Sequence, residues 1–298
     1  MERIQKVKPH RCPATPYGVL VERVLPYAVR AERVLPYTVS PPARAFVRWV
    51  MFLHKNPLWT TMGLPMRIYR GFLLDADNTL FDYDLAERQA LDETFDAALP
   101  GVPRDLARAA YRTINARYWA SYERGGMPLE ELKVGRFEEL LTTLGVPGEA
   151  RQTAYAYLDR LASKAMLLPH AREAVGELAR RARLCLVTNG IATVQRGRLA
   201  VSGLAGCFAA VVVSEELGCA KPDPRFFAEA CRALGLPPSE VLCVGDNPVA
   251  DVAGARGAGI DACWFSPDGR RWPGPGDPPL HVAKDLRETV NFAGGVFP

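Results

Sequence analysis

The chain has 298 residues, of which 48% are hydrophobic and 23% are charged, and this composition is typical of a globular protein with a sizeable core. No stretch approaches the roughly 20 uncharged apolar residues of a membrane-spanning helix, so we expect no membrane partner. The net charge of +4 is uneven, because residues 1–70 carry twelve Lys and Arg against three Glu. This segment lacks interleaved aromatic and basic positions, so we do not expect nucleic acid as a partner either.

The seven cysteines are scattered along the chain, and no two of them form a C-x-x-C pair. Several lie within apolar runs, among them Cys185 and Cys243, and this pattern is typical of buried, reduced thiols. The beginning of the sequence shows no signal-peptide pattern. Together these features predict a cytoplasmic protein, whereas nothing in the sequence predicts an oligomeric state.

Residues 1–66 differ in character from the rest of the chain. The segments TPYGVLVERV, LPYAVRAERV and LPYTVSPPAR, which together span residues 15–44, are near-copies with a period of ten. A ten-residue unit that contains a proline is too short to supply a surface on which copies could stack, so we expect this basic extension to be disordered. Globular sequence begins abruptly at Met66, which suggests a further hypothesis that translation starts at Met62 or Met66. The intact mass of the protein from its native host would test it.

Short apolar runs alternate with helical patterns from Ile68 onward. We expect strands at residues 68–74, 183–187, 209–214, 241–245 and 261–265. Most residues of these runs are apolar, with many Val and Leu, as is typical of parallel strands that are buried on both faces. The alternation of strands and helices predicts an α/β fold with a doubly wound, Rossmann-like parallel sheet.

Residues 84–165 interrupt this alternation, because they contain helical patterns and no strand. Prolines that favour helix starts and glycines that favour helix ends stand at Pro103, Pro128, Pro147, Gly125, Gly126 and Gly145. We therefore predict about four helices that form a cap over the carboxyl edge of the sheet. The cap is inserted into an α/β core made of residues 67–83 and 166–298.

Polar residues stand at or just beyond the ends of four predicted strands. They are Asp75, Asp77, Thr188, Asn189, Lys221, Asp246 and Asp251. Because ligands of open parallel sheets bind at the carboxyl ends of the strands, we expect these side chains to converge on one site. Taken alone, each short pattern is more typical of a turn, a loop or a helix cap than of a catalytic group. Four such patterns at four strand ends favour a common function.

The expected cluster has a specific chemistry. Several carboxylates within a few ångströms need a hard cation, and an all-oxygen ligand set favours Mg²⁺, which also binds substrate phosphate oxygens. Thr188 and the amides of the turn that follows it suit a phosphate group, and Lys221 supplies positive charge. One carboxylate of the pair Asp75 and Asp77 could attack phosphorus, and the other could transfer protons.

The four patterns D-x-D-x-T-L (75–80), T-N-G (188–190), A-K-P-D-P (220–224) and G-D-x-x-x-x-D (245–251) resemble the motifs of the haloacid dehalogenase-like hydrolase superfamily. The resemblance covers residues 67–298 and implies that Asp75 is the nucleophile and Asp77 the general acid and base. It implies further that Asp75, the main-chain carbonyl of Asp77 and Asp246 bind Mg²⁺. In this scheme Thr188, Asn189 and Lys221 bind phosphate, and Asp251 supports the metal.

The sequence is most similar to the noncanonical pyrimidine 5′-nucleotidases of this superfamily, for example in "YWASYERGGMPLEELKVGRFEEL" and "VSEELGCAKPDPRFF". This resemblance implies a cap that selects the substrate, for which Trp119, Tyr122 and Arg136 are our candidates. The alternative is that the two aromatic residues fill the cap core and that Arg136 is solvated.

We therefore expect a Mg²⁺-dependent phosphomonoester hydrolase that forms an aspartyl-phosphate. Its expected partner is a small phosphorylated metabolite, with a pyrimidine nucleoside monophosphate favoured. The alternatives are a phosphoglycolate or sugar-phosphate phosphatase of the same fold and, from a different class, a non-catalytic binding module.

Overall fold

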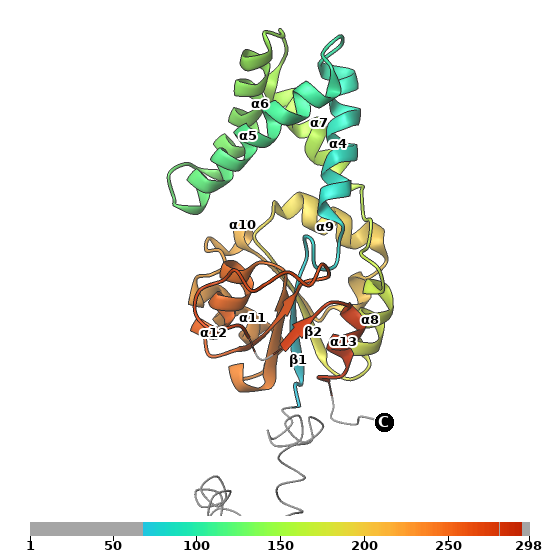
Figure 1. Cartoon of the computed structure of the whole chain (residues 1–298), viewed down its shortest axis with the longest axis vertical. Helices are drawn as coiled ribbons and strands as arrows, with labels where there is room; N and C mark the ends of the chain where they lie inside the picture. Colours follow the sequence, from blue (N-terminus) through green and yellow to red (C-terminus); the bar gives the residue numbers. More distant parts are fainter. Residues whose placement is uncertain (1–67, 280, 294–298) are drawn as a thin grey trace, which may run out of the picture. The chain divides into compact units, whose positions relative to one another are not determined.

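The computed structural model describes residues 68–279 and 281–293, all of which fall within the unit Arg67–Pro298 (Figure 1). The predictions for the basic repeats and for the translation start fall on residues 1–66, which lie outside the described residues.

A parallel sheet of six strands in the order β3-β2-β1-β4-β5-β6 forms the centre of this unit. The strands are β1 (Gly71–Asp75), β2 (Arg183–Thr188), β3 (Ala210–Val213), β4 (Val241–Gly245), β5 (Asp261–Phe265) and β6 (His281–Ala283). The bounds of the first five differ from the predicted bounds by at most three residues, and the predicted doubly wound α/β fold is confirmed. Strand β6 was not predicted, because it has three residues and, within the described ranges, pairs only with β5.

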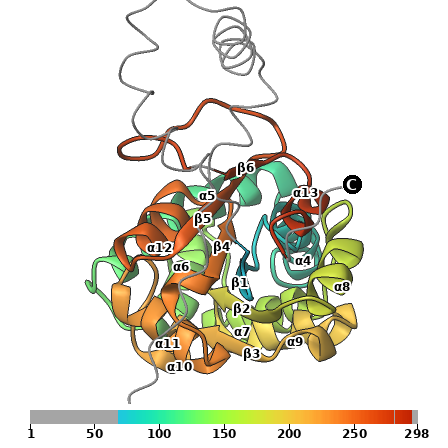
Figure 2. The same ribbon diagram turned by 90° about the horizontal axis from the view of Figure 1, so that it is seen from below.

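Helices cover both faces of the sheet (Figure 2). Phe72 and Leu74 of β1 contribute to one core with α8 (Ala171–Ala179), part of α9 (Ala192–Ser202) and α13 (Leu286–Val290). Leu73 points to the opposite core with α11 (Pro224–Leu234) and α12 (Gly254–Gly257). Successive residues of a strand alternate between faces, so the apolar run of β1 supplies both cores.

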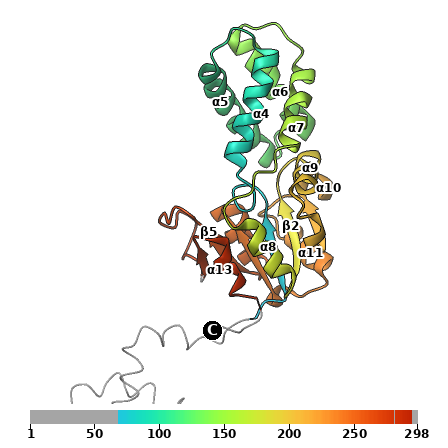
Figure 3. The ribbon, with the colours of Figure 1, turned by 90° about the vertical axis from the view of Figure 1, so that its right-hand side faces the viewer.

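Four helices follow β1 and group beyond the carboxyl ends of the strands (Figure 3). They are α4 (Tyr83–Ala98), α5 (Arg104–Glu123), α6 (Leu129–Leu144) and α7 (Ala150–Ala162). Their facing apolar side chains form a third core, which includes Phe95, Tyr111 and Phe137. Helix α6 ends at Gly145, whose φ of 66° is a left-handed conformation that glycine adopts without strain. Within the described ranges, no helix combines the length and apolarity of a membrane span.

Short helical turns complete the fold. They are α10 (Ser214–Leu217), η2 (Ala205–Cys207), η3 (Pro238–Glu240) and the π-helical turn η4 (Pro248–Ala253).

Two chain segments connect the four-helix group to the sheet, and they run side by side. Phe81 in the first segment forms an antiparallel bridge with Leu167 in the second. The amide of Asp82 donates to the carbonyl of Met166 at 2.9 Å, and the amide of Leu168 donates to the carbonyl of Leu80 at 2.9 Å. The two segments are therefore hydrogen-bonded to each other where they leave the sheet.

Candidate active site

A cavity of about 1220 Å³ lies between the carboxyl ends of the strands and the four helices α4–α7. Strands β1 and β4 are neighbours at the point where the strand order reverses, which is where open α/β sheets bind ligands. All of the site residues proposed from the sequence line this one cavity. They are Asp75, Asp77, Thr188, Asn189, Lys221, Asp246, Asp251, Trp119, Tyr122 and Arg136.

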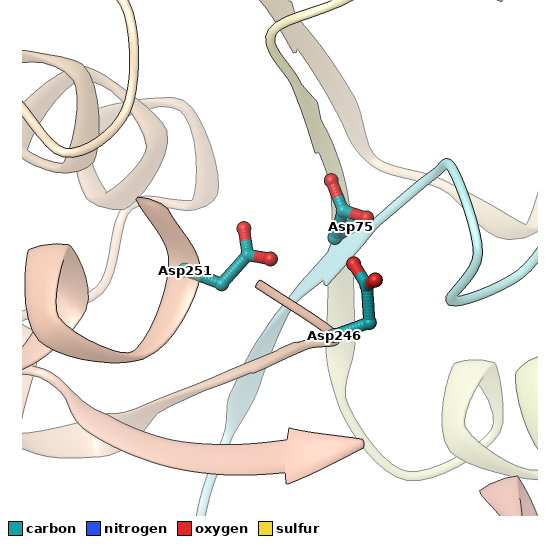
Figure 4. A group of neighbouring side chains, drawn as sticks. All are labelled: Asp75, Asp246 and Asp251. Carbon is teal, nitrogen blue, oxygen red and sulfur yellow. The ribbon is translucent and has the colours of Figure 1, made fainter. Parts of the chain in front are cut away.

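Three carboxylates meet on the floor of the cavity (Figure 4). Asp75 ends β1, Asp246 follows β4, and Asp251 lies in η4. One oxygen from each lies within 4.8 Å of one from each of the others. Asp246 is held near β1 because its amide donates to Thr79 Oγ1 at 3.1 Å. Thr79 belongs to the D-x-D-x-T-L pattern, so that threonine joins the ends of the two strands.

Lys221 supplies the counter-charge for two of these acids. Its Nζ lies 2.5 Å from Asp75 Oδ1 and 2.6 Å from Asp251 Oδ1, and it also donates to the carbonyl of Val187 at 3.3 Å. The side chains of Lys221, Asp75 and Asp251 are at most 8% exposed. A buried charge of this kind persists only with close partners of opposite sign. Burial lowers the pKa of Lys221, but the charges of Asp251 and Asp75 together outweigh burial and raise this pKa, so the side chain is cationic.

Burial and mutual repulsion change the acidity of the cluster. Burial raises the pKa of Asp75 well above its usual range, the nearby Asp251 and Asp246 raise it further, and Lys221 opposes these effects. Burial, followed by the charge of Asp251, raises the pKa of Asp246 to about 6. Carboxylates that resist ionisation in the absence of a cation are expected to ionise when one binds.

The donor set fits a hard divalent cation. It consists of carboxylate oxygens, which are the ligands that Mg²⁺ favours in proteins. The oxygens of Asp251 already accept hydrogen bonds from Lys221 Nζ and from the amide of Asn247, at 2.6 Å and 3.0 Å. Both oxygens of Asp251 are thus already hydrogen-bonded to protein groups, whereas Asp75 and Asp246 offer oxygens toward the cavity.

The T-N-G turn after β2 lies beside Lys221. Thr188 Oγ1 accepts a hydrogen bond from the amide of Gly190 at 3.0 Å. Asn189 uses both ends of its amide on the backbone of Lys221, since Nδ2 donates to the Lys221 carbonyl and Oδ1 accepts from the Lys221 amide, each at 2.8 Å. The side chain of Asn189 therefore fixes the loop that carries the lysine.

Asp77 has partners that the sequence analysis did not identify. Its Oδ2 accepts a hydrogen bond from Gln195 Nε2 at 2.7 Å, and its Oδ1 forms an ion pair with Arg198. Both partners lie on α9 and are at most 1% exposed. The two residues are three positions apart, which puts them on one face of α9, and this spacing is the signal in the sequence that could have identified them.

The three candidate residues of the cap have different environments. The rings of Trp119 and Tyr122 lie edge to face with centroids 5.8 Å apart, and both are partly exposed to the cavity. Arg136 is only 1% exposed, so the alternative that it is solvated is wrong. Its guanidinium lies 5.4 to 5.7 Å from the ring centroids of Tyr157, Phe137 and Tyr111. Its Nη1 donates to Asn115 Oδ1 at 2.6 Å.

The amino-acid sequence is similar to those of known hydrolases. The family model of the haloacid dehalogenase-like hydrolases matches residues 69–259. The pyrimidine 5′-nucleotidase YjjG of Escherichia coli is 32% identical over 217 residues, which are 72% of this chain and 93% of YjjG. A phosphoserine phosphatase of Thermus thermophilus is 40% identical over 178 residues, which are 57% of this chain and 71% of that enzyme.

Among solved structures, the HAD-hydrolase YfnB from Bacillus subtilis, determined with bound magnesium, superposes with a TM-score of 0.67. It is 31% identical, and the match covers 75% of this chain and 97% of YfnB. The chain therefore belongs to the haloacid dehalogenase-like hydrolase family. The predictions of this family and of an enzyme of the phosphatase type are confirmed.

Proposed function

We propose that this protein is a Mg²⁺-dependent phosphomonoester hydrolase that acts through an aspartyl-phosphate on Asp75, and that its substrate is a pyrimidine nucleoside 5′-monophosphate. The observation that carries the proposal is the contact of one buried ammonium, Lys221 Nζ, with both Asp75 and Asp251. A phosphate that enters this cavity meets the nucleophile and a fixed positive charge at the same point.

The first chemical step forms a bond between a carboxylate oxygen of Asp75 and phosphorus while the bond from phosphorus to the leaving oxygen breaks. Asp77 donates a proton to that leaving oxygen, so the product departs as an alcohol. In the second step water attacks the phosphoryl group on Asp75, Asp77 takes a proton from the water, and inorganic phosphate leaves. Both aspartates then have their original protonation states.

Asp75, Asp246 and the main-chain carbonyl of Asp77 are the groups that would hold Mg²⁺, with Asp251 supporting them. When bound, the cation supplies positive charge that lowers the repulsion between the anionic substrate and the carboxylates. Lys221 and Thr188, with the amides that follow Thr188, would bind the phosphate oxygens. In our proposal Asn189 contributes by fixing the backbone of Lys221.

The preference for a nucleotide is supported by the cap. Trp119 and Tyr122 present aromatic surface to the same cavity as Asp75, and flat aromatic surface suits a base by stacking. Asn115 lines the cavity and offers an amide donor for a carbonyl oxygen of the base or a hydroxyl of the sugar, and the buried Arg136 orients it through the bond to its Oδ1. The similarity to a pyrimidine 5′-nucleotidase over nearly the whole length of that relative gives the proposal independent support.

A panel of phosphate monoesters assayed with Mg²⁺ and with a chelator tests the proposal. The panel contains deoxyuridine and thymidine monophosphates, phosphoglycolate, a sugar phosphate and phosphoserine. We expect hydrolysis that requires Mg²⁺, with the highest kcat/KM on the pyrimidine nucleotides. A higher value on phosphoglycolate or the sugar phosphate would replace the nucleotide with a smaller substrate. Binding of phosphate esters without turnover would favour a non-catalytic module.

We also propose that the enzyme acts in the cytoplasm. The cysteines Cys185, Cys231, Cys243 and Cys263 are buried and form no disulfide within the described part of the chain, which suits a reducing compartment.

A further inference from the structure

The carboxylate of Asp77 is held from both sides by two buried residues of α9. Gln195 Nε2 donates to Oδ2 at 2.7 Å, and Arg198 Nη1 pairs with Oδ1. The side chain of Arg198 is 0% exposed, and within residues 68–279 and 281–293 its only carboxylate partner is Asp77. The two bonds fix the plane of the Asp77 carboxyl group as well as its position.

Arg198 also contacts both segments that connect the four-helix group to the sheet. In the first segment its guanidinium lies 4.4 Å from the ring centroid of Phe81 and 5.8 Å from that of Tyr83. In the second segment its Nε donates to the carbonyl of Lys164 at 3.2 Å. One side chain therefore joins Asp77 to both connections at the place where the four helices meet the core.

The T-N-G turn is packed against the same group. A Cβ atom on Gly190 would lie 2.3 Å from Gln195 Nε2, so a larger residue at this position would require the end of the glutamine beside Asp77 to shift. The phosphate-binding turn, Gln195 and the Asp77 carboxylate thus form one packed unit. A substitution that displaces Gln195 would break its hydrogen bond to Asp77.

The ion pair between the buried Arg198 and Asp77 is a poor way to stabilise the fold. A fully buried guanidinium loses its hydration, and one ion pair with a partly exposed carboxylate does not fully compensate for that loss. Moreover, Arg198 Nη2 and Gln195 Oε1 are buried and have no hydrogen-bond partner among the residues that the structure describes. Buried polar atoms are rarely left unpaired, and such exceptions are frequent at functional sites.

We propose that Arg198 and Gln195 are positioning residues that orient the Asp77 carboxyl group toward the leaving oxygen and tie its position to the two connections of the cap. The inference rests on the proposed function, because it assigns a role relative to the general acid of that reaction. Neither residue touches the substrate in this account, and both act through Asp77.

The role predicts a specific dependence on the leaving group. A general acid matters most when the departing oxygen is basic, as in an alkyl phosphate, and little when it is weakly basic, as in dinitrophenyl phosphate. Loss of Arg198 should therefore affect the two esters unequally. A structural role would reduce kcat/KM for both esters by the same factor.

The test measures kcat/KM with Mg²⁺ on thymidine monophosphate and on dinitrophenyl phosphate, since this parameter reports the first, acid-assisted step. We expect Arg198→Met to lose about 100-fold on the nucleotide and less than about threefold on the aryl ester, in the range typical of general-acid catalysis. Arg198→Lys should recover part of the loss. Arg196→Met removes an exposed arginine of the same helix that pairs with Glu216, and it should leave both values unchanged.

A double-mutant cycle completes the test. Asp77→Asn should show the same pattern as Arg198→Met, and the combined variant should be no worse than Asp77→Asn, because both changes remove one function. Gln195→Leu supplies the same measurements if Arg198→Met does not fold.

Equal losses on the two esters, or additive effects in the cycle, would overturn the positioning role. A wild-type enzyme that hydrolyses neither ester would instead remove the proposed function, and the inference with it.

Discussion

Lys221 Nζ lies 2.5 Å from Asp75 Oδ1, although 146 positions separate the two residues in the sequence. The contact is buried, and a second carboxylate, that of Asp251, shares the same ammonium at 2.6 Å. This ion pair therefore links the end of β1 to the loop before α11. Because the ammonium offsets the cost of grouping the acids, removing it should affect both stability and chemistry.

Lys221→Met should strongly destabilise the metal-free protein. It leaves Asp75 and Asp251 buried without their common counter-charge, and breaking a buried ion pair typically costs about 3–5 kcal/mol. Urea unfolding in the presence of a chelator measures the effect. As a matched control, Lys164→Met breaks a pair with Glu93, which is 51% exposed, and should cost at most about 1 kcal/mol. Similar losses for the two variants would contradict the structural role of Lys221.

Asp75→Asn should abolish turnover while the protein remains folded. The amide has nearly the same shape as the carboxylate but is a very poor nucleophile, so we expect kcat to fall by at least about a thousandfold. Circular dichroism and the thermal transition provide the check on folding, and a steady-state assay gives kcat. Substantial hydrolysis by a folded Asp75→Asn protein would assign the nucleophile to another residue.

The contribution of Asp246 to the stability of the metal-free protein should fall as the pH rises from about 4 to about 6. Burial raises the pKa of Asp246 to about 6, above its usual value of 3.8, so the folded state retains a proton that the unfolded state releases. Below this window the contribution is fully present, and above it the ionised group costs up to about 3 kcal/mol. The stability of Asp246→Asn relative to the wild type should therefore increase across this window, as urea unfolding at several pH values would show. A constant difference would contradict the shifted pKa.

Mg²⁺ should raise the Tm of the wild-type protein in proportion to the logarithm of its concentration, because it binds the folded state alone. Asp246→Asn removes a carboxylate that faces the cavity and should abolish this increase at the same metal concentrations. Asp268→Asn, which changes an exposed acid outside the cavity, should leave the increase intact. Thermal scans with and without a chelator measure the three responses. An increase that survives in Asp246→Asn would remove this residue from the ligand set.

Trp119→Ala should weaken nucleotide turnover more than turnover of a small phosphate ester. Stacking of a base on an aromatic side chain contributes about 1–3 kcal/mol, so kcat/KM for the nucleotide should fall about 5- to 150-fold. Tyr155→Ala alters an aromatic residue of α7 that does not line the cavity, and it should affect neither substrate. Equal losses on both substrates would exclude Trp119 from substrate selection.

Much of the core follows from local patterns in the sequence. The runs at 241–245 and 261–265 coincide with β4 and β5, because uninterrupted apolar residues bounded by turns have few alternatives in an α/β fold. The convergence of Asp75, Lys221 and Asp246 was predictable for a similar reason, since parallel strands bring their carboxyl ends to one edge. Strand β6 could not be predicted, because three residues carry too little pattern.

The environment of the side chains was less accessible to sequence reasoning. Arginine side chains are usually exposed, yet the side chain of Arg136 is enclosed by three aromatic rings and Asn115. Arg198 is likewise a basic residue in a polar-looking helix, and its burial depends on Phe81, which is 117 positions earlier in the chain. Such contacts depend on how the four-helix group meets the core, and local periodicity contains no information about that placement.

The most direct test of the central claim is to trap the phosphoryl group on the enzyme. The wild-type protein is mixed with substrate and Mg²⁺, quenched in acid within a single turnover, and reduced with borohydride, which converts an aspartyl-phosphate to homoserine. Peptide mass spectrometry then locates the modified residue. The account predicts homoserine at position 75 and at no other aspartate, and no modification in Asp75→Asn. Normal turnover with an unmodified Asp75, or with the modification at another residue, would contradict it.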